Sequence, residues 1–355
     1  MNELFQISFP GLGIEEFTLN RIAFSIGKLE VRWYGIVITM GILLAFLYAI
    51  FRGKRNEGVI MDDIIDVGLW TVILGILGAR LYYVLTTLDE YHYDSIIDVI
   101  AIWNGGLAIY GGIIGGCIGI LIACKIKKLK WRKLFDMVGP GVMIAQALGR
   151  WGNFFNGEAY GYPITDTTHF YLFNNEIVLP GGEGTLFHTL RMGLYPRGSS
   201  YPVYFHPTFF YECVWNVVGF ILINLFYKHK KYDGQVAILY FVWYGFGRMF
   251  IEGFRTDSLY IPGTSLRISQ CLGLFFLTVG VLLLIGIALL RRYKPAVYAS
   301  LIVGDEQAAS AAQTQAAEAT VTDGMAENGE EDATANEDAC NEKEKTEDKT
   351  DGTAD

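Results

Sequence analysis

Residues 135–161 read FDMVGPGVMIAQALGRWGNFFNGEAYG, and this stretch decides the fold. Its first part is apolar over about 20 residues, the length that a helix needs to cross a bilayer. Arg150, Asn153 and Glu158 then follow one another closely. An arginine at the bilayer centre costs at least ~2.5–3.5 kcal/mol on insertion scales, so lipid tolerates this cluster only where protein or water shields it. The stretch therefore predicts a transmembrane helix that ends at a site for something polar or anionic.

Six further apolar runs have a similar length. The chain of 355 residues is 52% hydrophobic, with a mean hydropathy of +0.31. We therefore expect an all-α integral membrane protein with seven transmembrane helices. The runs cover about residues 33–51, 64–86, 106–124, 135–153, 206–227, 234–253 and 269–290. The N-terminus lacks the basic segment of a cleaved signal peptide, so we expect the whole chain to be mature protein.

Basic residues mark alternate connections between these runs. Lys and Arg follow the first, third, fifth and seventh runs, whereas the loop between the second and third runs is acidic and has neither. Cytoplasmic loops of membrane proteins carry the excess of Lys and Arg. The N-terminus is therefore expected outside the cell and the C-terminus in the cytoplasm.

Three regions are expected along the chain. Residues 1–30 should form an extracytoplasmic arm, and residues 31–294 the membrane domain, in which residues 160–205 are too polar to cross the bilayer and should form a small outer head. From Leu301 onward there are sixteen Asp or Glu and three Lys, whereas the rest of the chain has 25 Lys or Arg and 21 Asp or Glu. A segment so acidic and so poor in large apolar residues cannot bury enough surface to fold. Residues 295–355 should therefore be a disordered cytoplasmic tail.

The sixth run carries a second polar cluster. Tyr244, Arg248, Glu252 and Arg255 follow one another at steps of four, four and three, which places them on one helical face. In isolation the pattern is also typical of a structural ion pair between Arg248 and Glu252. Inside lipid such a pair is rare and usually faces a functional interior, so we interpret the cluster as part of a site.

Other polar residues near the outer membrane surface each have an ordinary alternative. Arg80 either snorkels to the interface or lines the site. Tyr34 opens the first run, where an aromatic belt is the default explanation. Tyr110 lies beside glycines that are expected to serve helix packing. It either presents its hydroxyl to a cavity or belongs to the same packing face. His206 and Glu212 stand at the entry of the fifth run, an unusual place for titratable side chains.

By this topology, polar side chains from separate runs converge in the outer half of the membrane. They are Arg150, Asn153, Glu158, Arg248, Glu252, Arg255, Tyr34 and His206. Two or more guanidiniums that meet there match the oxygens of a phosphate bidentately. An anion buried at headgroup depth is most simply a phospholipid headgroup. The sequence thus predicts a membrane protein that binds a phospholipid phosphate from the outer side.

No motif for a metal or a nucleotide accompanies these residues. The sequence has no CxxC, no HExxH and no Walker-type Gly-Lys-Ser/Thr. Four cysteines fall within or beside the apolar runs and Cys340 lies in the tail, so no disulfide framework is expected. We expect no cofactor, no metal ion and no nucleic-acid partner.

The string Gly149–Glu158, with Gly161, resembles the signature of the bacterial prolipoprotein diacylglyceryl transferases. The resemblance runs from about residue 30 to 292, in the right order and on the right runs, and leaves out the acidic tail. Supporting matches are Arg32–Gly35, Gly78–Arg80 with Tyr83, Gly105–Gly106 before Tyr110–Gly112, His206–Glu212 and Tyr244–Arg255.

The resemblance implies an enzyme of the bacterial cell membrane. Such enzymes move the diacylglyceryl group of phosphatidylglycerol onto the lipobox cysteine of a prolipoprotein, forming a thioether and releasing glycerol phosphate. By similarity Arg150 and Arg248 would neutralise the leaving phosphate, and Glu252 or Glu158 would hold the guanidiniums. The expected substrate-binding set is Arg150, Asn153, Glu158, Gly161, Tyr34, Arg80, Tyr244, Arg255 and His206.

The attacking thiol has an ordinary pKa of about 8.5, so at neutral pH the formation of its thiolate must be favoured by the enzyme. Some members of the family that this chain resembles have a histidine, proposed as the base, where this chain has Tyr110. We expect Tyr110 to orient the thiol or the lipid, with the arginines supplying most of the activation.

Two other classes of protein share some of these features. A transporter or channel for an anionic solute or lipid is the main alternative, because buried Arg and Glu also line solute paths. Transporters often show an internal repeat, and we see none among the seven runs. A seven-span receptor is a third reading, although the seventh run lacks the lysine that retinal binding requires.

Overall fold

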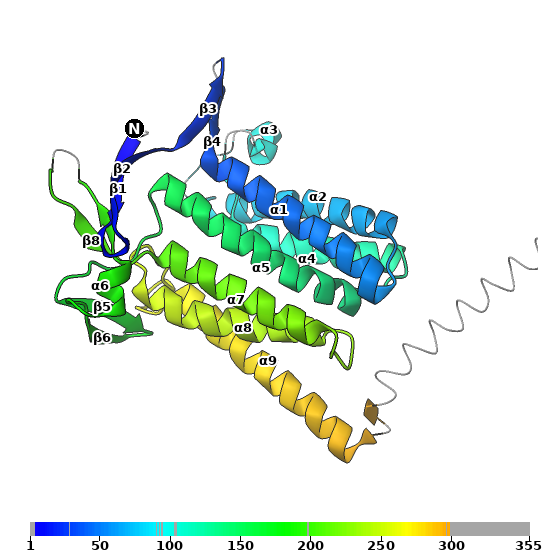
Figure 1. Ribbon diagram of the computed structural model, residues 1–355. Coiled ribbons are helices and arrows are strands. Elements are labelled where there is room, and N and C mark those ends of the chain that lie inside the picture. Colours follow the sequence, from blue (N-terminus) through cyan, green and yellow to red (C-terminus); the bar gives the residue numbers. More distant parts are fainter. Residues whose placement is uncertain are drawn as a thin grey trace, which may run out of the picture. The chain divides into compact units, whose positions relative to one another are not determined.

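The computed structural model describes residues 4–27, 29–89, 91, 93, 95–102, 105–196, 199–295 and 297–298. A helix covers each of the seven apolar runs (Figure 1). They are α1 (Trp33–Arg52), α2 (Met61–Thr86), α4 (Ile109–Ile126), α5 (Trp131–Asn156), α7 (Thr208–Tyr227), α8 (Gln235–Ile251) and α9 (Ile268–Tyr293). Shorter helices are α3 (Ile96–Ile100) and α6 (Leu186–Leu190).

Five of these helices are long and apolar enough to cross a membrane: α1 with the π-helical turn that follows it, α2, α4, α7 and α9. The other two helices carry more polar residues or are shorter. α5 contains Arg132, Lys133, Asp136 and Arg150, and α8 has 17 residues. The seven predicted helices are thus present, and five of them have the length and apolar composition of a membrane span.

The helices pack as two groups of neighbours. α2 packs along α4, whereas α5 packs against α1, α7 and α8. Glycines make the first pairing close: a Cβ atom on Gly115 would collide with the backbone carbonyl of Leu74. The glycine face predicted for the third run therefore lies against α2, which is the usual use of small residues between membrane helices.

Strands gather at one end of the helices, where α5 ends and α7 begins (Figure 1). A four-stranded sheet has the order β2-β1-β7-β8, from β1 (Leu4–Phe9), β2 (Ile14–Asn20), β7 (Met192–Leu194) and β8 (Val203–Phe205). Two hairpins, β3–β4 (Ile22–Ile26 and Leu29–Arg32) and β5–β6 (Thr167–Leu172 and Asn175–Pro180), complete the strands among the described residues. We call residues 4–20 and 160–205 the strand cap.

The strand cap corrects one expectation, because the chain is mostly helical rather than all-α. Residues 4–20, which belong to the arm expected at residues 1–30, pair with the segment 160–205: Ile7 opposes Leu194 in the sheet. Ile7 is 1% exposed and packs in one apolar cluster with Phe154 of α5 and Phe209 of α7. The strand cap therefore shares a core with the helix ends beneath it.

A buried polar cluster lies at the opposite end of the helices. Lys230, between α7 and α8, contacts Glu57 at 2.6 Å and Asp136 of α5 at 3.1 Å. Tyr227 donates to Glu57 at 2.8 Å. Asp136 also accepts the backbone N–H of Ala237 in α8 at 2.8 Å. We call these residues the Lys230 cluster; it joins the π-helical turn after α1 to α5, α7 and α8.

The chain divides into two compact units, residues 1–285 and 286–355. The described part of the second unit consists mainly of the last turns of α9. The disorder predicted for residues 295–355 concerns a tail that lies almost entirely outside the described residues.

Candidate functional site

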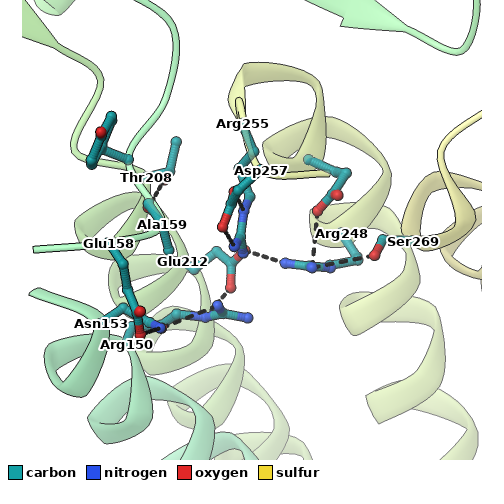
Figure 2. A network of polar contacts seen from close by, with 12 residues as sticks. Arg150, Asn153, Glu158, Ala159, Thr208, Glu212, Arg248, Arg255, Asp257 and Ser269 are labelled. Carbon is teal, nitrogen blue, oxygen red and sulfur yellow. Dashed lines mark hydrogen bonds and ion pairs between the residues drawn. The ribbon is translucent and has the colours of Figure 1, made fainter. Parts of the chain in front are cut away.

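A single buried carboxylate stands at the centre of the site. Glu212 lies in the first turns of α7, and its side chain is 7% exposed. It pairs with Arg150, Arg248 and Arg255, the last at 3.5 Å (Figure 2). Guanidiniums from the end of α5, from α8 and from the segment after α8 therefore meet at one point. We call Glu212 and these arginines the arginine cluster.

Arg248 is held from two sides besides Glu212. Its Nη2 lies 2.9 Å from the Glu252 carboxylate, one helical turn further along α8, as the spacing in the sequence indicated. The same nitrogen donates to Ser269 of α9 at 3.3 Å. The carboxylate of Glu252 is 2% exposed, so this ion pair is buried. The hydrogen bonds of Arg248 to Glu212 and Ser269, together with this ion pair, orient the guanidinium.

The arginine cluster has an excess of positive charge in its buried part. Three arginines face two buried carboxylates, Glu212 and Glu252. The third acidic partner is Asp257, whose side chain is 46% exposed and accepts from Arg255 at 2.8 and 2.9 Å. Burial raises the pKa of Asp257, but the hydrogen bonds from Arg255 outweigh burial and hold that pKa below its usual value. With Asp257, three arginines face three carboxylates, but only two of these carboxylates are buried, so it is the buried part of the site that favours an anion.

The end of α5 supplies the other polar arm of the site. Asn153 accepts from Arg150 at 3.4 Å and donates to Glu158 at 3.1 Å (Figure 2). Asn156 donates to the same carboxylate oxygen at 3.1 Å. The chain can turn back here because Gly157 ends α5 in the left-handed conformation, with φ +63°. The signature string is therefore a helix end folded so that Glu158 reaches Asn153.

Tyr34 lies next to this arm. A Cβ atom on Gly152 would stand 2.9 Å from the ring of Tyr34, so glycine is what lets α1 bring the ring this close to α5. Tyr34 is near enough to Arg150 and Glu158 to interact with both charges. Among the sequence-predicted residues, Tyr34 thus joins the site through its contact with α5.

Two further tyrosines approach the arginine cluster from other helices. Tyr244 lies one turn before Arg248 in α8 and interacts electrostatically with Arg248, Glu212 and Arg150. Tyr110, at the start of α4, interacts electrostatically with Arg248. Its ring is 6.4 Å from that of Tyr82 in α2. The structure therefore places Tyr110 at the edge of the cluster, on the side of the α2–α4 pair.

Arg80 lies elsewhere and has a different set of partners. Its guanidinium donates to the backbone carbonyls of Val99 and Gly105 at 2.7 Å each, Asp98 at 2.6 Å and Gly106 at 3.0 Å. The side chain thus holds the segment that leads into α4 and Tyr110. The guanidinium also lies over the ring of Tyr83, at 5.6 Å, so Arg80 belongs to the packing of α2 against the segment before α4.

His206 and Gly161 lie in the packing between the strand cap and the helices. His206 is fully buried; its Nε2 is 2.7 Å from the Thr168 hydroxyl and its Nδ1 is 3.1 Å from the Tyr211 hydroxyl. A Cβ atom on Gly161 would stand 2.6 Å from both the His206 Cβ and the carbonyl oxygen of Phe254. Both residues therefore position the segments around the site: the backbone of Gly161 forms an antiparallel bridge with that of Arg255, whereas the ring of His206 contacts Thr168 and Tyr211.

The residue that sequence reasoning left out of the site is Glu212. Its place at the entry of an apolar run is unusual for a carboxylate, but the sequence alone does not assign it to the site. The signal was present: a carboxylate in an apolar run needs a cationic partner, and the chain offers several arginines in neighbouring runs. Which arginines it meets depends on contacts far apart in the sequence.

This chain is similar to a set of named proteins along most of its length. A family model described as prolipoprotein diacylglyceryl transferase matches residues 21–286. A phosphatidylglycerol--prolipoprotein diacylglyceryl transferase of Lactobacillus delbrueckii subsp. bulgaricus is 46% identical over 281 residues, which are 78% of this chain and 91% of the relative. Proteins of the same name from Streptococcus pneumoniae (42% over 269 residues, 75% and 94%) and Staphylococcus aureus (36% over 290 residues, 82% and 96%) are also similar.

The central role of Glu212 predicts a large loss of stability when its charge is removed. In Glu212→Gln, three largely buried guanidiniums lose their shared counter-ion, and breaking a buried ion pair typically costs about 3–5 kcal/mol. Thermal unfolding of the purified protein in detergent should show a clearly lowered midpoint. The control is Glu30→Gln, an exposed residue 4.0 Å from Arg32. Equal midpoints for the two variants would contradict the central role of Glu212.

His206 predicts a pH dependence of stability. His206 lies before α7, outside the helix, and burial lowers its pKa to about 4 from an ordinary value of 6.5. The neutral form stabilises the fold fully above pH 6.5, and this contribution falls by about 3 kcal/mol as the pH drops from 6.5 to 4. Unfolding in detergent, followed across this range, should show a smaller loss for His206→Gln than for the unmodified protein. The exposed His229→Gln should keep the full loss; a matching change there would argue against His206 as the source.

Proposed function

The chain belongs to the prolipoprotein diacylglyceryl transferase family, and on that premise we propose that it transfers the sn-1,2-diacylglyceryl group of phosphatidylglycerol to the lipobox cysteine of prolipoproteins. The observation that carries the proposal is the arginine cluster, in which guanidiniums from separate helices surround Glu212. This step forms a thioether and releases glycerol phosphate.

The chemistry requires stabilisation of a leaving phosphate. The cysteine sulfur attacks the glyceryl carbon that is bonded to the phosphate oxygen. As the S–C bond forms, the C–O bond breaks and its electron pair stays on the phosphate of glycerol phosphate. Arg150 and Arg248 are the cations that meet this developing charge, since fixed donors aimed at a forming anion give the largest single rate effect in many enzymes.

Glu212 keeps these arginines ready before the lipid arrives. A guanidinium has five N–H donors, and Arg150 and Arg248 use only part of them on Glu212, Asn153, Glu252 and Ser269. The remaining donors are available to phosphate oxygens. Arg255, Asn153, Glu158, Tyr34 and Tyr244 complete the headgroup pocket in this proposal. Three predicted residues would affect substrate binding indirectly, by fixing nearby backbone. Arg80 holds the segment that leads into α4, and His206 and Gly161 hold the segments between the strand cap and the helices.

The thiol must lose its proton to react. The positive field of the arginine cluster favours the thiolate, because a nearby cation lowers the pKa of a thiol. Tyr110, at the edge of the cluster, is placed to orient the thiol or the lipid. We assign it no acid–base role.

The protein is a multi-pass membrane protein, and we place all seven long helices across the bacterial cell membrane. The Lys-rich end of the helices, with Lys230 and Lys228, would face the cytoplasm according to the excess of basic residues there. The strand cap and the arginine cluster would then lie on the outer side, with the acidic tail inside. Phosphatidylglycerol of the outer leaflet would reach the arginines from the surrounding lipid.

A transfer assay tests the activity and the two arginines together. The purified protein is incubated with phosphatidylglycerol vesicles and a lipobox peptide, and the thioether-linked lipid is measured by mass spectrometry. Arg150→Lys and Arg248→Lys keep the charge but lose the bidentate fork, so each should lower kcat by about 10²–10³. The exposed Arg292→Lys should be unaffected. Absence of product from the unmodified protein, with passage of an anionic solute across the vesicle membrane, would favour the transporter alternative.

The role of Tyr110 predicts a modest effect of removing its hydroxyl. Tyr110→Phe should lower kcat by less than about tenfold, the effect of one ordinary hydrogen bond, and should leave the pH–rate profile unchanged. Tyr82→Phe, which alters the neighbouring ring in the same way, is the matched control. A displaced pH–rate profile, or a drop as large as that of Arg248→Lys, would make the Tyr110 hydroxyl the base.

A further inference from the structure

The end of α8 is held by the first turn of α9. Helix ends leave backbone carbonyls without helical partners. Here Arg267 donates through Nη1 to the carbonyl oxygen of Glu252, and Gln270 donates to the carbonyl oxygen of Met249 at 3.1 Å. Arg267, just before α9, and Gln270 of α9 therefore contact carbonyls at the end of α8 and in the turn that follows it, where the Glu252 carbonyl also accepts the backbone N–H of Arg255 at 3.1 Å. A cation at this position also interacts favourably with the negative end of the helix dipole.

Arg267 is an unusual buried cation. It is 1% exposed, and no carboxylate lies within ion-pair distance of it in the described part of the chain. Its guanidinium lies over the rings of Tyr171 at 5.2 Å and of Tyr162 and Tyr260 at 5.9 Å. Its Nη2 donates to the Tyr162 hydroxyl at 2.9 Å. Aromatic faces and two oxygen acceptors thus take the place of a counter-ion.

The carbonyl that Arg267 holds belongs to Glu252, and the carboxylate of Glu252 holds Arg248. The pair between Glu252 and Arg248 is 2.9 Å long. Ser269 of α9, two residues after Arg267, also accepts from Arg248, at 3.3 Å (Figure 2). The start of α9 therefore contacts Arg248 directly through Ser269, and Arg267 reaches it indirectly through Glu252.

We propose that Arg267 is a positioning residue of the transfer reaction: it fixes the backbone of Glu252 so that the Glu252 carboxylate holds Arg248 at the leaving phosphate. This inference rests on the proposed function. Arg267 does not touch the arginine cluster itself and acts through Glu252. A displacement of about 1 Å at a catalytic group can cost about 10²-fold in rate. Replacing Arg267 should therefore lower the rate by shifting the guanidinium of Arg248.

The two Nη donors of the Arg267 guanidinium also connect the strand cap to the backbone of Glu252. Its second donor holds Tyr162, whose backbone N–H donates to the carbonyl of Phe254 at 2.8 Å. Gln270 extends the link, because it donates to the carbonyl of Tyr171 at 2.7 Å. Lysine has a single ammonium in place of the fork and would hold the Glu252 carbonyl or Tyr162, but not both in the same geometry. The arrangement therefore depends on arginine.

The test measures kcat and KM for phosphatidylglycerol in the transfer assay with Arg267→Met, Arg267→Lys and Tyr162→Phe. Arg267→Met should lower kcat by about ten- to hundredfold and leave KM nearly unchanged, since the effect falls on the transition state. Arg267→Lys should recover part of that loss. Tyr162→Phe, which keeps the ring but removes one acceptor, should have the smallest effect. Rates are expressed per folded molecule, determined from the monodisperse fraction in detergent.

The matched control is Arg191→Met. Arg191 also stacks on a tyrosine in the strand cap, 4.3 Å from the ring of Tyr204, away from the Glu252–Arg248 pair. Its kcat per folded molecule should equal that of the unmodified protein. The inference is overturned if Arg267→Met keeps a normal kcat, or if its rate per folded molecule falls no further than that of Arg191→Met.

The remaining outcomes are also decisive. If Arg267→Met does not fold, a normal kcat for Arg267→Lys and Tyr162→Phe together overturns the inference, and a lowered kcat for Arg267→Lys with an unchanged KM supports it. Failure of the unmodified protein to form the thioether would instead overturn the proposed function. The two failures are therefore distinguishable.

Discussion

One buried carboxylate shared by three guanidiniums is the interaction on which the rest of the structure depends. In an apolar bundle an isolated charge is strongly disfavoured, so Glu212 and its arginines require one another. Because Arg150 belongs to α5, Glu212 to α7 and Arg248 to α8, satisfying these charges brings three helices to one point. The same requirement explains why the neighbouring elements carry polar side chains that face inward, such as Asn153 and Ser269.

The arrangement also suits a ligand that competes with a resident anion. Glu212 fills the centre of the cluster while leaving part of each guanidinium unused. A phosphate that approaches these donors replaces or shares the role of the carboxylate without any need to bring new cations together. The charges are thus organised before the ligand binds, and little reorganisation is left for the reaction itself. The family to which the chain belongs acts on a phospholipid, which is consistent with such a site.

The parts of the fold and site that could be predicted are those set by local patterns. The seven helices follow from apolar runs, and the Arg248–Glu252 pair follows from a spacing of four residues. Arg150, Asn153 and Glu158 lie within one helix end, so their contacts are also local.

In contrast, the central position of Glu212 depends on three helices that are distant in the sequence. The engagement of Arg80 with the carbonyls of residues 98–106 and the burial of His206 beneath the strand cap are equally non-local. The strands do not follow from local patterns, because they are short and because residues 7–8 of β1 pair with residues 193–194 of β7, about half the chain away.

The Lys230 cluster and the arginine cluster together constrain sliding of the helices along their axes. In α5, Asp136 belongs to the first and Arg150 to the second, about 21 Å apart at 1.5 Å per residue. α7 joins both clusters in the same manner through Tyr227 and Glu212, and α8 through Ala237 and Arg248. A longitudinal shift by a single residue would misalign charged partners at both levels at once. The axial register of these three helices is therefore fixed at two separate levels. The apolar side chains between the two levels need only fill space.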